Sequence, residues 1–340
     1  MNSICNQKGA SIIAVIAIML ILAVMGAALV SLVTTGSDVS VNQLQSEQAL
    51  NVAEGGKEYA LRQLKENCSY AGEANIALGS GTFTVTVTGA GTKTITSTAT
   101  VGSATRVVVA TAQVSCGSIA VDSSSRDRGR GVISLTWQHN VSGVNRILIV
   151  GVSIRNSGSQ TVTGVTYSGT ALTFIGAQDN GTNVRVELWR SLVEPATGNN
   201  PIVVTLSASA NVVGGAVSLT EVDQTTPIDA AFVSATGNSN APSVGITTVT
   251  NNAWVIDTMA SPDATATVGA GQTEQWNFNT VGGPPGTLHV RGAGSTEGPN
   301  PAGGVTMNWT LSAAQQWAIG AVALKPAPAG VTPLTWQEQY

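Results

Sequence analysis

The chain has 340 residues, which is long enough for two domains with sizeable cores. Charged residues make up only 10% of it, against about 25% in an ordinary soluble domain. The net charge is -4 and no run of lysine and arginine occurs, so we expect no nucleic acid partner. Two histidines and the absence of a Cys-x-x-Cys pair leave little material for a zinc site, and we expect no metal or cofactor.

The first element is an uncharged apolar run over residues 10–33, directly after Lys8 and Gly9. As a helix, a run of 24 residues spans about 36 Å, and a bilayer core is about 30 Å thick. The apolar region of a signal peptide is only about 7–15 residues long, so this run is too long for one. We therefore predict a transmembrane helix that stays in the mature chain.

The helix is expected to continue beyond the apolar run. From Asp38 to Leu64, apolar residues recur at steps of mostly three and four, which is typical of an amphipathic helix. No proline occurs before Pro195. The pattern predicts one long helix over residues 10–66, apolar on all sides at first and amphipathic later.

These residues resemble the N-terminus of type IV pilins. Lys8-Gly9 precedes an uncharged helix, and residues 53–56 (Ala-Glu-Gly-Gly) are similar to a segment of PilX-type accessory pilins. In that family a prepilin peptidase cuts after the glycine, which implies a leader over 1–9 and a methylated N-terminus at Ala10. The resemblance implies a helix held first in the inner membrane and then packed in a filament core. The alternative is a plain protein anchored by one span.

One position departs from the pattern of the main pilins, which carry glutamate at the fifth mature position. Here that position is Ala14. A carboxylate in a membrane is costly unless it is paired, so its absence removes both a cost and a docking contact. The rank of the subunit, major or minor, stays open. Small residues that permit close approach of neighbouring helices are Ala14, Ala17, Ala23, Gly26, Ala27 and Ala28.

After the helix, residues 79–116 alternate apolar residues with threonine in three runs separated by glycine-rich turns. This pattern predicts an antiparallel meander, and we place the pilin-like head over 67–116. If this segment is exported, we expect Cys68 and Cys116 to form a disulfide. Closing a loop of about 49 residues would stabilise the fold by roughly 4 kcal/mol. The alternative is two separate buried thiols. Cys5 lies in the predicted leader.

The remaining chain is rich in β-forming residues. Residues 117–130 are polar and are interpreted as a linker, and about twelve strands follow over 131–326. The fold class predicted is an α+β pilin-like part followed by an all-β sandwich, most simply one jelly roll. Four blocks resemble a jelly-roll module of bacterial secreted and surface proteins, a module without one assigned activity: Leu135-Thr136-Trp137, Val186-Glu187-Leu188-Trp189, Val222-Asp223-Gln224-Thr225-Thr226-Pro227 and Trp317-Ala318-Ile319-Gly320.

Catalytic patterns are weak in this region, and we expect no enzyme. His139 and His289 are the only histidines, and no G-x-S-x-G elbow accompanies them. The carboxylates show no pairing pattern typical of a glycosidase. Glu221, Asp223 and Asp229 offer oxygen ligands for calcium, but no EF-hand spacing is present.

Tryptophans offer a second kind of site, because their rings stack on sugars. Most of them lie inside strand patterns, where packing in the core is the commoner role. Trp276, in the segment GQTEQWNFN, fits a core strand least well and is the candidate contact for a surface glycan.

The tail over 327–340 contains two prolines and then alternates Leu334 and Trp336 with polar residues. We hypothesise that it returns to the head as a further strand, which would make the sandwich an insertion. The alternative is a frayed terminus.

Together, the pattern and the resemblance indicate a structural subunit of an extracellular type IV pilus-like filament that displays a β-sandwich. Its partners would be copies of itself or other pilins, prepilin peptidase, and the inner membrane before assembly. The alternative is a minor or tip pilin that acts as an adhesin toward a surface glycan or another partner.

Overall fold

The structure is a computed structural model that describes residues 8–115, 117–280 and 288–339. The chain divides into two compact units. Unit 1 consists of Met1–Leu64, Tyr70–Val114 and Val331–Tyr340, and unit 2 of Lys65–Ser69 and Ser115–Gly330. Unit 2 is therefore an insertion into the chain of unit 1.

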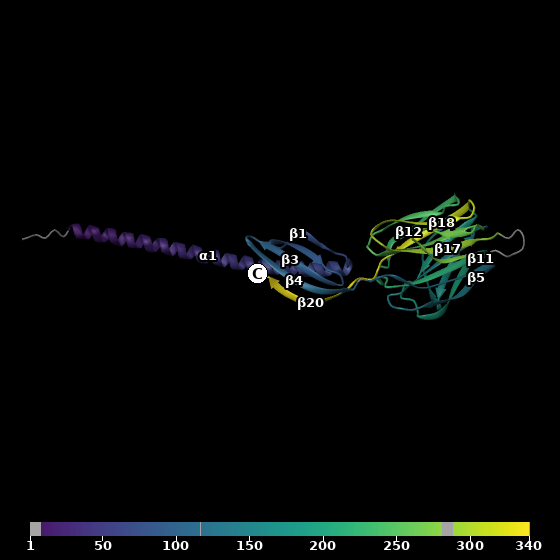
Figure 1. Cartoon of the computed structure of the whole chain (residues 1–340), viewed down its shortest axis with the longest axis horizontal. Helices are drawn as coiled ribbons and strands as arrows, with labels where there is room; N and C mark the ends of the chain where they lie inside the picture. The colour runs from purple at the N-terminus through teal and green to yellow at the C-terminus, as the bar shows by residue number, and fades with distance from the viewer. Residues whose placement is uncertain (1–7, 116, 281–287, 340) are drawn as a thin grey trace, which may run out of the picture. The chain divides into compact units, whose positions relative to one another are not determined.

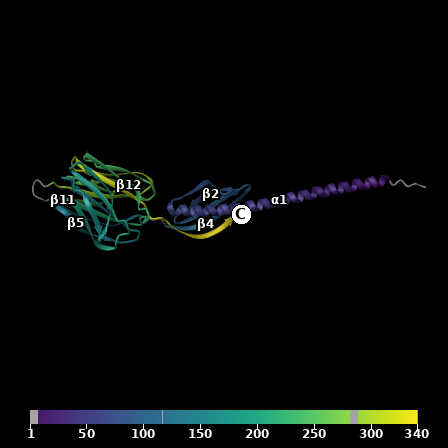
Figure 2. The same ribbon diagram turned by 180° about the vertical axis from the view of Figure 1, so that it is seen from behind.

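Unit 1 is one long helix with a five-stranded antiparallel sheet along its second part (Figure 1). Its strand order is β1-β2-β3-β4-β20. The view from behind shows the same helix running along the strands, with β2 and β4 labelled on either side of it (Figure 2). The elements are α1 (Lys8–Glu66), β1 (Gly72–Leu78), β2 (Gly81–Thr88), β3 (Thr92–Val101), β4 (Ala104–Ser115) and β20 (Gly330–Gln339). This arrangement confirms the predicted helix and meander.

The last strand, β20, lies at the edge of this sheet beside β4. The hydroxyl groups of Thr111 and Thr335 form a hydrogen bond of 2.6 Å. The Arg106 guanidinium lies 3.3 Å from the Glu338 carboxylate. The tail therefore returns to the first unit, as hypothesised, and is not a frayed end.

Buried and exposed residues alternate along the strands of unit 1, which explains how the sheet covers the helix. In β2, Phe83, Val85 and Val87 are buried, whereas the residues between them are more exposed. The same alternation occurs in β3 and β4, so one face of the sheet is apolar. The buried helix residues that meet this apolar face are Ala49, Val52, Ala53, Ala60, Leu61 and Leu64.

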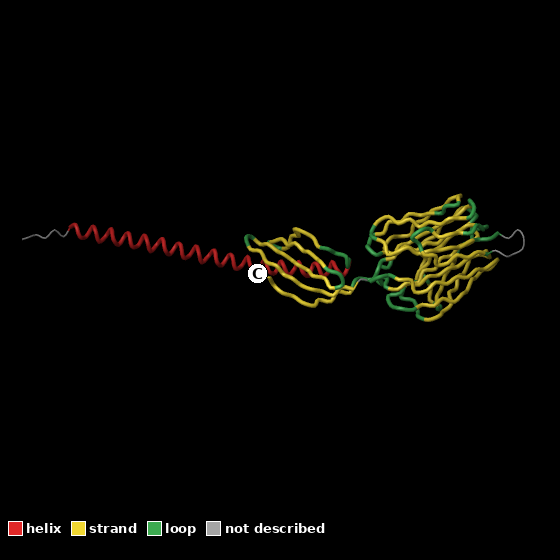
Figure 3. The backbone as a smooth tube through the Cα atoms, in the orientation of Figure 1, coloured by secondary structure: helices red, strands yellow, loops and turns green. Residues whose placement is uncertain are grey.

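Unit 2 consists of strands and loops over its described residues from 119 onward (Figure 3). The strands of its first half are β5 (Ala120–Val141), β6 (Ile147–Arg155), β7 (Val162–Tyr167), β8 (Thr170–Ala171), β9 (Thr173–Asn180), β10 (Val184–Arg190) and β11 (Gly198–Thr220). Those of its second half are β12 (Ile228–Ser239), β13 (Ser243–Thr248), β14 (Ala253–Ser261), β15 (Ala266–Val268), β16 (Thr273–Asn279), β17 (Arg291–Asn300), β18 (Gly303–Leu311) and β19 (Gln315–Leu324).

The two halves have the same topology. The pair β6–β11 corresponds to β14–β19, and β6–β10 corresponds to β14–β17. Likewise β10–β9 corresponds to β17–β16, and β7–β11 corresponds to β15–β18. The long pair β5–β11 corresponds to both β12–β19 and β13–β18. The first half forms one seven-stranded sheet, in which β5 and β11 are long, and the second half forms a five-stranded and a three-stranded sheet. The predicted all-β jelly-roll sandwich is confirmed, and its strands form two repeats of similar topology.

The two repeats pack against each other through the sheets that contain β6 and β14. Ile149 of the first repeat and Ile256 of the second belong to one buried cluster, and the Ser153 hydroxyl donates to the Met259 carbonyl across the interface. Strands β6, β14 and β19 are almost entirely buried, which means that both of their faces are covered. Such strands have continuous apolar sequences instead of alternating ones.

The interpretation of residues 117–130 as a linker is wrong. Residues from Ala120 onward form the first half of β5, which pairs with β11 as far as Thr220. The segment is polar because β5 contributes mainly backbone hydrogen bonds, and its serine and arginine side chains lie at a sheet edge. Polar composition without an apolar face hid this strand in the sequence.

Candidate functional site: the projecting part of the helix

The first part of α1 extends beyond the sheet of unit 1 and is exposed on all sides (Figure 1). Every residue from Ile12 to Leu44 is exposed, and the helix is long and apolar enough to cross a membrane. An exposed apolar surface of this size is compatible with a membrane anchor. The large apolar side chains exposed there are Ile12, Ile13, Val15, Ile16, Ile18, Met19, Leu20, Ile21, Leu22, Val24, Met25, Leu29, Val30, Leu32, Val33, Val39, Val41 and Leu44.

The polar groups of this segment are suited to apolar surroundings. Ile12 to Ser37 carries no charge, and Asp38 is the first acidic residue. The hydroxyls of Thr35 and Ser40 donate to helix carbonyls four residues earlier, at 2.8 and 3.0 Å. Hydroxyls bonded in this way need no water.

Small residues gather on two sides of the projecting helix. At 100° per residue, Ala14, Ala17 and Ala28 lie within about 60° of one another. A second group lies roughly opposite and consists of Ala23, Gly26 and Ala27. Both groups are exposed, and a Cβ added at Gly26 would meet nothing within 4 Å. The described residues leave both groups open to solvent, and their role in packing against neighbouring helices stays a prediction.

The segment Ala53-Glu54-Gly55-Gly56 has a clear structural role. A Cβ at Gly56 would lie 2.3 Å from the Ser97 hydroxyl and 2.7 Å from the Phe83 ring. Only glycine lets helix and sheet approach this closely. Tyr59, one turn later, packs edge-on against Phe83 and donates a 2.9 Å hydrogen bond to Glu73. This segment fixes the helix to the sheet.

The processing and disulfide residues are only partly described. Gly9 and Ala10 lie in the first turns of α1. Residues 1–7 of the expected leader, with Cys5, lie outside the described residues, as does Cys116, the expected partner of Cys68. Leader cleavage and the Cys68–Cys116 disulfide therefore stay predictions.

Trp276 does not form the predicted glycan contact. Its side chain is 1% exposed and belongs to the core where the two repeats meet. Added Cβ atoms at Gly215 and Gly294 would lie 2.1 and 2.0 Å from its ring, so the ring fills the space that these glycines leave. A ring enclosed in this way cannot stack on a sugar, and the prediction is wrong.

The acidic residues considered for calcium do not converge on one point. Asp223 accepts hydrogen bonds from the Thr225 and Thr226 amides. Burial alone would raise the pKa of Asp223, but its hydrogen bonds and charged surroundings outweigh burial, so the pKa is lowered. Asp229 accepts from the Thr250 amide at 3.0 Å, and Glu221 accepts from an asparagine side chain. These carboxylates hold loops, and the described residues contain no cluster of three or more metal-ligating side chains.

The two histidines lie in different repeats. His139 is buried, and its Nδ1 forms a 2.7 Å hydrogen bond with the Ser125 hydroxyl. Burial lowers the pKa of His139 to about 4, so the ring is neutral at pH 7. Nδ1 of His289 lies 3.1 Å from the Thr280 carbonyl oxygen. The structure does not bring the two rings into one site.

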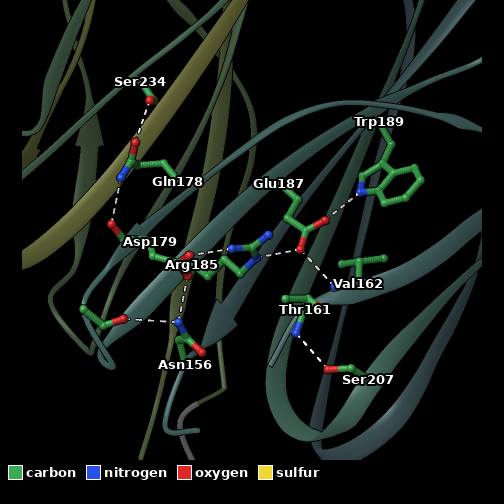
Figure 4. Close-up of polar contacts among 11 residues, drawn as sticks. Asn156, Thr161, Val162, Gln178, Asp179, Arg185, Glu187, Trp189, Ser207 and Ser234 are labelled. Atoms are coloured by element: carbon green, nitrogen blue, oxygen red, sulfur yellow. Dashed lines mark hydrogen bonds and ion pairs between the residues drawn. The ribbon is translucent and has the colours of Figure 1, made fainter. Parts of the chain in front are cut away.

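Sequence reasoning missed a buried polar network in the first repeat (Figure 4). The Arg185 guanidinium lies 2.7 Å from Glu187 and 2.6 Å from Asp179. Glu187 is 1% exposed and also accepts from the Trp189 indole and the Val162 amide. The alternation in Val-Arg-Val-Glu-Leu-Trp places these side chains on one face, which was the available signal. Arg185 and Glu187 therefore each have several partners among the described residues.

A second buried carboxylate lies in the other repeat. Asp257 is fully buried and accepts hydrogen bonds from the Ser295 amide and hydroxyl and from the Trp309 indole. Burial raises its pKa to about 7 in spite of these bonds. Its place in an apolar run gave no sign of this role.

No family model matches the chain, and no curated protein does. Among solved structures, a conserved protein of unknown function from Pseudomonas aeruginosa PAO1 is similar at 12% identity with a TM-score of 0.19. That similarity covers 73% of this chain and 90% of the other chain. A TM-score this low supports no argument about fold or function.

Proposed function

We propose that this chain is a subunit of an extracellular type IV pilus-like filament. Its projecting helix is held in the inner membrane before assembly and packs among the helices of neighbouring subunits afterwards. The observation that carries the proposal is the uncharged, fully exposed surface of α1 from Ile12 to Val33.

The energetics support a covered helix. Burying one large aliphatic side chain contributes about 1.5–3 kcal/mol, so covering this surface contributes tens of kcal/mol. The 22 residues from Ile12 to Val33 span about 33 Å as a helix, close to the thickness of a bilayer core. The same surface suits lipid first and other helices later, and the small residues around Ala14 and Gly26 favour close packing between helices.

The proposal includes processing by resemblance. A prepilin peptidase would cut after Gly9, and Ala10 would become the methylated N-terminus. Determination of the mature N-terminus by sequencing tests this step. A start at Ala10 supports the proposal, whereas a start at Met1 or beyond Val33 contradicts it.

The second candidate is a minor or tip subunit, and Ala14 is the observation that favours it. Without a carboxylate there, the helix lacks a group to neutralise the N-terminal amine of a neighbour. Gold labelling of unit 2 separates the two ranks. Label along whole filaments identifies a major subunit, and label at filament ends identifies a tip subunit. Label only on membranes would contradict both and favour the plain anchor.

A further inference from the structure

Three arginines lie on one face at one end of unit 2. Arg128 pairs with Val213, and Val213 pairs with Ser153 on β6. Arg126 and Arg155 lie two residues from Arg128 and Ser153 along their strands, so all three arginines point to the same side of the sheet. That side faces the second repeat, because Ser153 bonds across to it. Two strand spacings and two residue steps separate Arg128 from Arg155, roughly 12 Å between Cα atoms.

Two of these guanidinium groups are held in place by an aromatic ring. The Cζ atoms of Arg126 and Arg128 lie 5.1 and 4.4 Å from the centre of the Phe278 ring. Arg128 also donates to the Asn279 carbonyl oxygen. A stacked guanidinium loses less conformational freedom when it binds an anion, and its planar fork matches a carboxylate or sulfate group.

Arg155 has donors that lack partners. Its Nε and Nη1 atoms are buried and form no hydrogen bond with any described residue. Only Nη2 has an acceptor, the Asn183 side chain at 3.5 Å. Burial lowers the pKa of Arg155, as expected for a charge removed from water without compensation. Buried charged donors without acceptors are costly, so an anion that binds beside this guanidinium would offset part of that cost by its charge.

No carboxylate balances this cluster within the described chain. Arg126, Arg128 and Arg155 form no ion pair there, whereas Arg185 has two acidic partners. Asp127 is adjacent in sequence but occupies the alternate position on β5, so it points to the opposite face. A local excess of positive charge stands out in a chain whose net charge is -4.

The cluster lies at the end of the sheets opposite to the chain connections of unit 2. The chain enters β5 at Ala120, which pairs with Thr220, and it leaves the second repeat after Leu324, which pairs with Trp254. The cluster lies toward the other end of the same strands. A ligand bound to this cluster would therefore not meet the segments by which the chain enters and leaves unit 2.

We propose that this end of unit 2, formed by Arg126, Arg128 and Arg155, binds the carboxylate or sulfate groups of an acidic glycan. Nucleic acid fits less well, because DNA-binding proteins neutralise on the order of 6–10 phosphates and this cluster has three guanidinium groups on an acidic chain. The inference is independent of filament assembly, since binding is measured on the unassembled chain.

The test uses the full chain in detergent micelles and isothermal titration calorimetry. The probes are a heparin-derived oligosaccharide, a polygalacturonate oligosaccharide that carries carboxylates alone, a neutral dextran oligosaccharide and a short DNA duplex. The variants are R126Q/R128Q, R155Q and the charge-retaining R155K. The matched control is R190Q, because Arg190 lies toward the other end of β10, pairs with Ile149 and donates to the Ser191 carbonyl oxygen.

We expect heparin, polygalacturonate or both to bind and dextran not to bind. R126Q/R128Q and R155Q should each weaken binding by about tenfold or more, R155K should weaken it less than R155Q, and R190Q should change it by less than twofold. Arg126 is exposed, so R126Q alone gives a test that folding does not confound. The proposal is overturned if no acidic glycan binds, if R190Q weakens binding as much as the others, or if DNA binds more tightly than both glycans through the same arginines.

Discussion

Gly56 of α1 lies directly against Phe83 of β2, so close that an added methyl group would come within 2.7 Å of the ring. This contact joins the buried half of the helix to the sheet, whereas no described residue of the chain covers the part of the helix from Ile12 to Leu44. The division of α1 into a packed part and a projecting part underlies the proposed function.

Replacing Gly56 should loosen unit 1. Gly56→Val forces the helix away from Ser97 and Phe83, and overpacking of this kind costs about 1–3 kcal/mol. Hydrogen exchange of the β2 and β3 amides, followed by mass spectrometry, should show faster exchange. Gly36→Val is the control, because a Cβ at Gly36 meets nothing within 4 Å. Equal protection in both variants would contradict the packing described here.

Replacing Gly26 should leave unit 1 folded but reduce filament assembly. Gly26→Val leaves the fold of unit 1 intact, because nothing lies near that position in the chain. It adds bulk where neighbouring helices are expected to approach, so we predict a lower fraction of the protein in sheared filaments. Val30→Ile enlarges a position that is already large and serves as the control. Normal filament yield from the Gly26 variant would count against close packing at this position.

Removing β20 should destabilise unit 1. Truncation before Val331 exposes the edge of β4 and removes the contacts of Thr335 and Glu338. We expect a loss of about 2–4 kcal/mol, measured as faster exchange of the β4 amides. Glu338→Gln, which removes only the ion pair, should have a smaller effect. An unchanged exchange profile after truncation would show that the tail does not support the sheet.

Cys68 and Cys116 should be linked in the mature chain. Peptide mapping without reductant should recover the two cysteine-containing peptides as one cross-linked species. Reduction should lower the free energy of unfolding by roughly 4 kcal/mol, because the closed loop restricts the unfolded chain. Alkylation of either thiol without prior reduction would contradict the pairing.

His139 should make unit 2 sensitive to acid. Its folded pKa of about 4 is lower than the unfolded value of 6.5, so the unfolded state takes up a proton first as the pH falls. Its contribution to stability is therefore complete above pH 6.5 and is lost as the pH falls toward 4, by up to about 3 kcal/mol. Asp257 acts in the opposite direction over a similar range, because its raised pKa favours the folded state at lower pH.

The comparison that isolates His139 is His139→Asn. The variant should be less stable at pH 7 but should lose less free energy of unfolding between pH 6.5 and 4, measured by denaturant titration. An identical pH slope in both proteins would contradict the assignment.

The long helix and the meander could be predicted because each has a clear period. The uncharged run from Ala10 and the alternation around Phe83 leave little choice of structure. The return of β20 could be proposed because Leu334 and Trp336 alternate with polar residues. The local pattern of apolar and polar residues was sufficient to predict an element wherever one of its faces is apolar.

Prediction failed where burial or pairing is not visible in local pattern. The first half of β5 is polar, so it was interpreted as a linker, although its backbone completes a sheet with β11. By sequence, Trp276 fits a core strand least well, whereas in the structure Gly215 and Gly294, distant in sequence, enclose its ring. The arginine cluster arises from the registers of β5, β11 and β6 together, and no single segment contains it.

Assembly through the projecting helix is best tested by helical reconstruction of native filaments with electron cryomicroscopy. We predict that residues 10–44 form part of a central bundle of helices without lipid, with unit 2 outside that bundle. Filaments that lack this chain, or a chain found only as a membrane-embedded monomer, would contradict it.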